Sequence, residues 1–395
     1  MGKREKRFTA LFRDWTPGVF SCEVLAGFSL NSETLVRVRG EIPRELDVGF
    51  SKVTVEKVTR ALQREGGFKI WLAGANPEQD EPIRFWGGRL FESSAGSSSN
   101  IESVIRQLQR DRLAQHQQRV GILATIGQGA QADELSSLLE QHRVERALMA
   151  ADGTNATLSL KSSRRQVMAC EKRAYVPPPG LVDFIRHEAD PKAGVFTGIR
   201  LQDFHLVQEI FWAFRNKRMF RVFGPHLDLL FQANRDSGLK NRLRAMIKEL
   251  EILALSQDEA LALVADLNLF GAHREFDPTN KDHIEQLVGA IAGLGAKITS
   301  VTLAEHGVAV MAGGTMYRHN GYKPPKGVRD TAGAGDAFLA ALVYFYVLQN
   351  RWVNKTSVNV KTLMRAIQCA QFVAAHKVSH YGSSSGIPSE RAIKL

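Results

Sequence analysis

Short apolar strands alternate with helices through the second half of the chain, and this alternation constrains the fold more than any other feature. The expected strands lie at residues 194–198, 220–223, 252–255 and 300–303. The expected helices lie at residues 204–216, 241–251, 258–266 and 283–294. Strands joined by helical crossovers run parallel, and a parallel sheet is buried on both faces. The alternation therefore predicts an α/β fold, a three-layer α/β/α sandwich with a mostly parallel central sheet.

The first half of the chain contains hairpins that lie outside this alternation. Strands are expected at residues 22–28, 34–40, 120–126, 157–160 and 166–170, with a turn at 29–33 between the first two. Helices are expected at 101–113 and 132–142, the first after a loop of small residues at 93–100. The early hairpins predict a small β lid, about residues 35–89 plus the hairpin 157–170.

The composition is that of an ordinary globular protein, with 44% apolar and 24% charged residues. No apolar run reaches membrane-spanning length, and the N-terminus lacks the apolar core of a signal peptide. The three cysteines, Cys22, Cys170 and Cys369, are widely separated and do not have metal-binding spacing. They fit packing roles in a reducing compartment, so we expect a cytoplasmic protein.

The chain is basic, with 52 Lys and Arg residues against 41 Asp and Glu residues and a net charge of +11. Such an excess is compatible with nucleic-acid binding. The basic residues are, however, spread over several short clusters without an arginine–aromatic repeat. This distribution favours an enzyme with anionic small-molecule ligands over a nucleic-acid-binding protein.

The stretch DTAGAGDAF, residues 330–338, places small residues and an acid directly before an apolar helix. Gly333, Ala334 and Gly335 leave the backbone bare, so a ligand can approach it closely. The N-terminus of a helix presents N–H groups and a partial positive charge, and both attract anions. Asp336 is therefore either a helix cap or a reactive group beside a bound anion.

Together with the strand ends at 252–260 and 300–310, this stretch resembles the ribokinase family, the PfkB-type carbohydrate kinases. It matches the family signature DTxGAGDxF at every specified position. The resemblance implies one ribokinase-like kinase domain over residues 1–395, with a lid that closes over a small-molecule substrate and excludes water. It also implies an ATP- and Mg²⁺-dependent phosphotransferase with an alcohol acceptor, a sugar or sugar-like molecule. Lid sheets in this family often pair between subunits, so a homodimer through the lid is expected.

The resemblance assigns the transfer chemistry to the GAGD loop. Phosphoryl transfer needs positioning, charge neutralisation and removal of the proton from the attacking hydroxyl. The resemblance implies that Asp336 is the base that accepts this proton. It also implies that the backbone N–H groups of Ala334, Gly335 and Asp336, after the turn at Gly333, form the anion hole for the phosphate.

Metal and nucleotide contacts are also implied by the resemblance. Glu259 corresponds to the acid of the NxxE motif that organises Mg²⁺ through water, with Ser256 in place of the Asn. Alternatively, Glu259 is an ordinary acid in the first turn of a helix. The implied nucleotide contacts are Thr302, Glu305, Gly307, Thr331, Gly333, Gly335 and Gly382. Thr302, Glu305 and Gly307 belong to a stretch that matches the family turn TLGxxG, with Ala304 in place of its first Gly. Residues 382–386 are alternatively a flexible turn without a nucleotide contact.

The acceptor end departs further from the family pattern. The family's N-x-D is matched by Asn31 and Glu33, and its GGxxxN loop by Gly96 and Asn100, with Ala95 at the first Gly. The resemblance implies that these four residues, with Asp336, hold the substrate. The family's D-P-N-x-R becomes GPHLD at residues 224–228, which lacks both charged residues.

Three alternatives stay open at this point. Residues 26–38 and the long insertion after them resemble ADP-dependent sugar kinases, whereas the turn at 302–307 favours ATP as the donor. A nucleoside is the second possible acceptor. The third alternative is a catalytically silent relative that binds a partner through its basic surface, and turnover of ATP with any sugar or nucleoside would exclude it.

Overall fold

The computed structural model describes residues 14–15, 22–28, 30–38, 52–62, 67–72, 78–79, 81, 83–95, 97–128, 130–141, 145–151, 155–161, 166–171, 175–177, 179–188, 190–215, 219–267, 269–270, 276–349 and 357–393.

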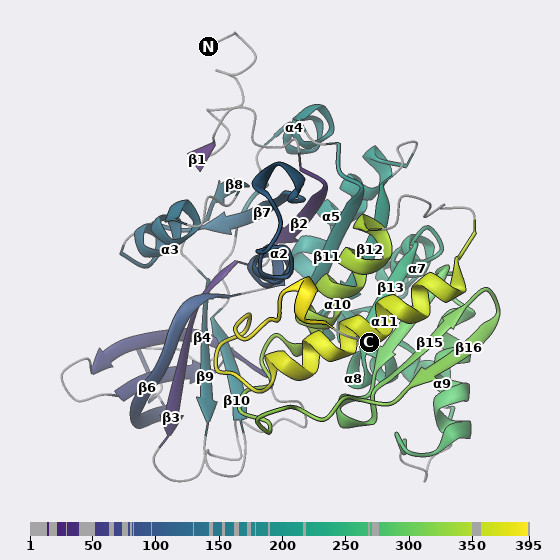
Figure 1. Ribbon diagram of the computed structural model, residues 1–395. Helices are drawn as coiled ribbons and strands as arrows, with labels where there is room; N and C mark the ends of the chain where they lie inside the picture. Colours follow the sequence, from purple (N-terminus) through teal and green to yellow (C-terminus); the bar gives the residue numbers. More distant parts are fainter. Residues whose placement is uncertain are drawn as a thin grey trace.

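A central sheet of ten strands organises the described part of the chain (Figure 1). Its strands, in spatial order, are β1 (Asp14–Trp15), β8 (Glu145–Ala150), β7 (Val120–Ile126), β2 (Val24–Phe28), β11 (Ala193–Ile199), β12 (Phe220–Pro225), β13 (Ile252–Ser256), β14 (Ile298–Thr302), β15 (Val308–Ala312) and β16 (Thr315–His319). The run from β8 to β14 is parallel throughout, and β1, β15 and β16 are antiparallel to their neighbours. The predicted mostly parallel sheet is confirmed.

Helices cover both faces of this sheet, which gives the three predicted layers. One face packs against α2 (Ser97–Leu108), α10 (Ala334–Val343), the π-helical turn Tyr344–Leu348 and α11 (Val360–Lys377). The other face packs against α4 (Leu181–Glu188), α5 (Leu201–Ala213), α6 (Leu227–Ala233), α7 (Ser237–Ile247), α8 (Gln257–Leu263) and α9 (Lys281–Ala292). A smaller cluster joins α3 (Ala130–Gln141) to β7. The fold is therefore a three-layer α/β/α sandwich.

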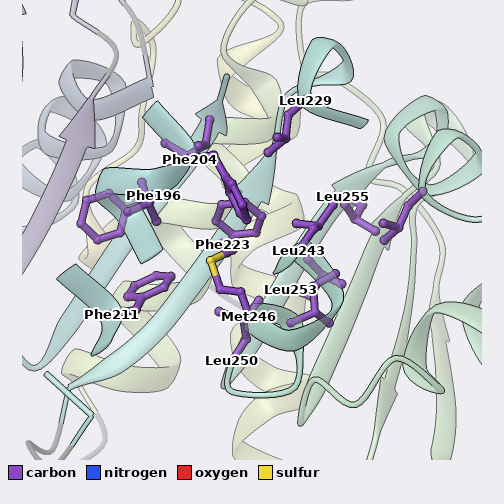
Figure 2. Packing of buried hydrophobic residues seen from close by; sticks show 14 of the residues in the cluster. Phe196, Phe204, Phe211, Phe223, Leu229, Leu243, Met246, Leu250, Leu253 and Leu255 are labelled. Carbon is purple, nitrogen blue, oxygen red and sulfur yellow. The ribbon is translucent and has the colours of Figure 1, made fainter. Parts of the chain in front are cut away.

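Aromatic side chains fill the core beneath α5 (Figure 2). Phe196 of β11 meets Phe211 of α5 edge to face, with ring centroids 5.3 Å apart. Phe196 also stacks with Phe28, with ring centroids 5.6 Å apart. Alternate residues of the same strand, such as Val195, pack into the cluster on the opposite face. Burial on both faces explains why these strands are continuously apolar rather than alternating.

Six further strands form a separate closed barrel, at the lower left of Figure 1. In ring order they are β10 (Gln166–Glu171), β4 (Lys52–Leu62), β5 (Gly67–Leu72), β6 (Ile83–Ala95), β3 (Asn31–Val38) and β9 (Asn155–Lys161). The predicted hairpin of β9 and β10 is confirmed by their antiparallel pairing. Each strand pairs with two neighbours, so the ring leaves no open strand edge among these six strands.

Two expected connections are regular structure instead. The turn expected at residues 29–33 is wrong, because β3 already begins at Asn31 and pairs Asn31 with Ala95 and Glu33 with Ser93 of β6. The loop expected at 93–100 is likewise the end of β6 and the first turn of α2. Pairing with β6 and β9, which lie far away in the sequence, extends β3 beyond its local turn signal.

Several helices begin earlier than expected. The helix expected at 241–251 begins at Ser237, because the side chain of Asp236 accepts hydrogen bonds from the N–H groups of Gly238 and Leu239. The antiparallel strands β15 and β16 are joined by a turn at Gly313 and Gly314, both at positive φ. Within the described ranges, no helix is both long and apolar enough to cross a bilayer.

Candidate active site

A cavity of about 290 Å³ lies between the carboxyl ends of three sheet strands and the N-terminus of α10. Its walls come from the ends of β11, β13 and β14, the start of α8 and the start of α2. It is lined by Ser97, Thr197, Gly198, Ala254, Leu255, Ser256, Glu259, Ser300, Thr302, Thr331, Ala332, Gly333, Ala334, Gly335, Asp336, Phe338 and Leu339. Ligands of open α/β sheets bind at this edge of the strands.

The loop before α10 has a conformation that only glycine allows. Gly333 has φ 73°, and a Cβ at this position would collide with the carbonyl oxygen of Ser383. The first helical hydrogen bond runs from Ala337 N to Gly333 O at 2.8 Å. Gly335 differs, because a Cβ there would meet no heavy atom within 4 Å. Its backbone faces the open cavity.

One member of the implied anion hole is already engaged. Ala334 N donates to the carbonyl oxygen of Thr331 at 3.2 Å. Gly335 and Asp336 also precede the bond from Ala337 that begins the helical ladder. Gly335 and Asp336 both belong to the first turn of α10 and line the cavity.

The carboxylate of Asp336 is held by a residue of the facing helix. Asn100 donates from Nδ2 to Asp336 Oδ2 at 2.7 Å. Asn100 is only 3% exposed, and its Oδ1 accepts a hydrogen bond of 2.8 Å from Ser383 Oγ. Both polar atoms of the amide are engaged inside the protein. The structure thus brings together two predicted site residues, Asn100 and Asp336, in direct contact.

Ser256 and Glu259 form a capping box at the start of α8. Glu259 Oε2 accepts from Ser256 N at 2.8 Å, and Ser256 Oγ accepts from Glu259 N at 3.4 Å. The spacing S-x-x-E is the sequence signature of this arrangement. Both residues also line the cavity. The structure therefore shows both residues in a helix-capping role. The carboxylate of Glu259 and the hydroxyl of Ser256 are still part of the cavity wall.

Glu259 fits a magnesium ion that is held through water. The described residues contain no cluster of three acidic, histidine or cysteine side chains of the kind that cages a metal. Mg²⁺ does not require such a cage, because it keeps several waters and binds one or two carboxylates with substrate phosphates. Glu259 lines the cavity, its Oε2 accepts from Ser256 N, and its Oε1 has no hydrogen-bond partner among the described residues.

The predicted nucleotide turn after β14 is only partly on the cavity. Thr302 lines it and donates from Oγ1 to Leu255 O at 3.4 Å. The side chain of Glu305 is 81% exposed and lies beside His306, outside the cavity lining. Gly307 has φ 92°, and a Cβ there would collide with His319 O. The glycine is therefore required by the close approach of the chain at residues 319–321.

Gly382 lies behind the loop, away from the cavity lining. Its N–H donates to Asp330 Oδ2 at 2.8 Å, and Asp330 Oδ1 accepts from Ala332 N at 3.0 Å. The neighbouring Ser383 approaches Gly333 from the same side. In the structure this predicted nucleotide contact supports the turn at Asp330, whereas Thr331 lies on the cavity.

The predicted acceptor residues at the barrel are described by their backbone only. Asn31 and Glu33 lie two apart, on one face of the end of β3 that pairs with the end of β6. β6 leads directly to the start of α2, which carries Asn100. The barrel end and Asp336 are therefore linked through α2. Gly96 lies outside the described residues.

The sequence interpretation did not assign several residues of the cavity wall. Thr197 and Gly198 lie near the end of β11, and the Cβ of a residue replacing Gly198, which has φ 64°, would lie 2.7 Å from Ser97 Oγ. The hydroxyl of Ser300 is buried in the floor and has no hydrogen-bond partner among the described residues. The rule that ligands bind at the carboxyl ends of parallel strands could have identified the first two. Ser300, inside β14, carries no such signal.

Solved structures with the same fold are ribokinase from Giardia lamblia, adenosine kinase from Sinorhizobium meliloti and a nucleoside kinase from Burkholderia thailandensis in complex with inosine. The ribokinase is 15% identical with a TM-score of 0.65, over 94% of this chain and 97% of that one. The adenosine kinase is 14% identical with a TM-score of 0.64, over 94% and 98%. The nucleoside kinase is 14% identical with a TM-score of 0.57, over 93% and 94%.

The family model of the pfkB carbohydrate kinases matches residues 95–390. This range runs from the end of β6 to the last turn of the described chain and includes the whole cavity lining. No curated protein matches the chain in sequence. With its sandwich fold, its strand-end cavity and the glycine loop before α10, the chain belongs to the pfkB family of carbohydrate kinases.

Proposed function

We propose that this protein transfers the γ-phosphate of ATP to a hydroxyl group of a sugar or sugar-like acceptor. The observation that carries the proposal is the position of Asp336. It stands on the cavity wall at the first turn of α10, next to the bare backbone of Gly335. A base and an anion-binding helix start on one cavity are what transfer to a hydroxyl requires.

In this proposal Asp336 accepts the proton of the attacking hydroxyl. The N–H groups of Gly335 and Asp336 bind the transferring phosphate, with the turn at Gly333 setting their direction. The role of Asn100 changes from the sequence-based expectation. Its amide holds Asp336 Oδ2 and Ser383 Oγ, so we assign it to the positioning of the base.

The adenosine part of ATP is proposed to occupy the side of the cavity near Thr302 and Thr331. Glu305, whose side chain is 81% exposed, stays a predicted nucleotide contact beside them. Gly382 acts indirectly, through its bond to Asp330. We further propose that Asn31, Glu33 and Gly96, at the barrel end, contact the acceptor. Glu33→Ala should then raise the KM for the acceptor and leave the KM for ATP unchanged, and the opposite pattern would remove Glu33 from the acceptor site.

Glu259 is proposed to hold Mg²⁺ through water, with Ser256 keeping its carboxylate in place by the capping box. When bound, Mg²⁺ neutralises part of the phosphate charge and orients the phosphate groups. The chain's own contribution is the placement of one carboxylate oxygen toward the cavity. The helix start at α10 supplies further partial positive charge.

The barrel is proposed to act as the lid, which excludes water from the transfer step. The expected homodimer through the lid stays a prediction. Because the six barrel strands close into a ring, such a dimer would have to use barrel faces or loops instead of strand edges. Since ATP is abundant inside cells and the sequence has few cysteines, the proposal places the enzyme in the cytoplasm.

The acceptor class is open between sugars and nucleosides, because proteins of the same fold include a ribokinase and an adenosine kinase. The deciding experiment measures the initial rate with ribose, fructose, glucose, adenosine and inosine, at saturating Mg²⁺. ATP and ADP are tested separately as donors, and Asp336→Asn is the matched control. We expect turnover with at least one acceptor and a higher kcat/KM with ATP. A higher kcat/KM with ADP would overturn the donor assignment. ATP binding without turnover of any acceptor would favour a silent relative.

A further inference from the structure

A fully buried lysine lies directly behind the loop that begins α10. Lys377, the last residue of α11, is 0% exposed. Lysine side chains are almost never fully buried unless they are paired. Its Nζ donates to the backbone carbonyl oxygen of Asp330 at 2.8 Å. The proposed transfer step does not use this ammonium group, so its position requires another explanation.

The same turn contains a buried acid. Asp330 is also 0% exposed, and its carboxylate accepts the N–H groups of Ala332 and Gly382 at 3.0 and 2.8 Å. Arg329 N and Asp330 N both donate to Val378 O, at 2.7 and 3.2 Å. These bonds attach the segment before the glycine loop to the end of α11. Lys377 and Asp330 therefore form one buried unit that supports the loop.

A negative charge at this place opposes the binding of phosphate. Asp330 is three residues before Gly333, and the cavity wall itself carries the carboxylates of Glu259 and Asp336. Among the described residues that line the cavity there is no Lys, Arg or His. Charges act more strongly across a protein interior than across water. A buried ammonium behind the loop therefore lowers the repulsion that a bound phosphate would meet.

We propose that Lys377 is a built-in cation of the phosphate site. It is a positioning residue, because it acts through the turn at Asp330 and does not touch the substrate. Its ammonium offsets the buried carboxylate of Asp330 and fixes the carbonyl before the glycine loop. The N–H groups of Gly335 and Asp336 then stay directed at the cavity. The inference rests on the proposed function, since it explains how the same loop binds phosphate.

The test replaces the side chain and then supplies the missing cation. Lys377→Ala removes a group the size of propylammonium and leaves a cavity that a small ammonium ion can fill. With tetramethylammonium as the monovalent cation, we expect kcat/KM for ATP to fall by about 10- to 100-fold. Ethylammonium should restore a large part of the loss. Wild type should not respond, and neither should Lys361→Ala, a change at an exposed lysine near the other end of α11.

A second variant covers the case in which Lys377→Ala does not fold. Lys377→Met keeps most of the volume but has no charge and leaves little space. We expect it to fold, to raise the Kd for ATP about tenfold or more, and to show no rescue by ethylammonium, while the KM for the acceptor stays unchanged. Wild-type kcat/KM and ATP affinity in Lys377→Met would overturn the assignment.

Thermal unfolding separates this inference from the proposed function. Ethylammonium should raise the Tm of Lys377→Ala relative to tetramethylammonium at equal ionic strength, and should not change the Tm of wild type. If this response appears but wild type transfers phosphate to no acceptor, the proposed function fails, and the Kd for ATP of Lys377→Met alone decides the built-in cation. If ethylammonium neither raises the Tm nor restores activity of Lys377→Ala, the role of Lys377 is refuted, whatever wild type catalyses.

Discussion

Asn100 donates a hydrogen bond from Nδ2 to Oδ2 of Asp336 at 2.7 Å, although the two residues are 236 positions apart in sequence. The contact joins the first turn of α2 to the first turn of α10. Ser383 Oγ holds the other end of the same amide at 2.8 Å. Three segments of the chain thus meet at the proposed base, and its carboxylate is fixed before any substrate arrives.

Replacement of Asn100 should therefore slow phosphate transfer more than it weakens the binding of ATP. We expect Asn100→Ala to lower kcat by about 10- to 100-fold, because a base that is no longer held loses its geometry. The KM for ATP should change little. Steady-state kinetics with the best acceptor measures both parameters.

Gln107→Ala is the matched control for stability. Gln107 is also on α2, and its amide donates to Ser384 O at 2.7 Å, but it does not line the cavity. Both variants should lose about 0.5–1.5 kcal/mol of unfolding free energy, the typical net contribution of one hydrogen bond. Only Asn100→Ala should lose kcat. Equal losses of kcat in the two variants would assign Asn100 a structural role alone.

Two glycines of the loop should respond differently to the same change. Gly335→Ala meets no protein atom within 4 Å, so the variant should fold with a Tm close to that of wild type. If phosphate approaches this backbone, the added methyl group should lower kcat/KM for ATP by about 10²-fold. Normal activity in a stable Gly335→Ala protein would place the phosphate elsewhere.

Gly333→Ala should instead damage the fold. The residue has φ 73°, and the new Cβ would collide with Ser383 O. We expect a loss of about 2 kcal/mol or more of unfolding free energy, from the backbone strain and the displaced closing segment. Denaturant unfolding measures this loss, and an unchanged midpoint would contradict the described turn.

Ala304 should be replaceable with a gain in stability. It is the one residue other than glycine with positive φ, 49°, in the described part of the chain, and it stands where the family turn has its first glycine. Glycine takes this conformation without a Cβ penalty, so Ala304→Gly should stabilise the protein by about 0.5–1 kcal/mol. Urea unfolding tests this, and a lower midpoint would show that the turn does not strain alanine.

The sheet could be predicted from the sequence because its signals are local. The parallel strands β7, β11, β12 and β13 are short apolar runs that are each followed by a helix, and the glycine loop precedes an apolar helix. The capping box of Ser256 and Glu259 also follows from its S-x-x-E spacing. For Glu259 the ordinary helix-start interpretation is thus visible in the structure, and the metal role stays a prediction.

The site contacts could not be predicted, because they join distant segments. Neither the bond between Asn100 and Asp336 nor the bond between Lys377 and Asp330 has a periodic signal. The turn expected around Asn31 failed for the same reason, since β3 is extended by partners in β6 and β9. Strand pairing within the barrel therefore determines the structure of this segment more strongly than its local polarity does.

The most direct test of the proposed role of Asp336 is a comparison of wild type with Asp336→Asn. For each protein, phosphate transfer from ATP to the best acceptor is followed by ³¹P NMR, and the Kd for ATP is measured by calorimetry. Asparagine keeps the shape of the side chain but cannot accept the proton of the hydroxyl. We predict that Asp336→Asn loses about 10²- to 10⁴-fold in kcat while its Kd for ATP stays close to that of wild type. A variant that forms the phosphate ester at the wild-type rate would contradict the account.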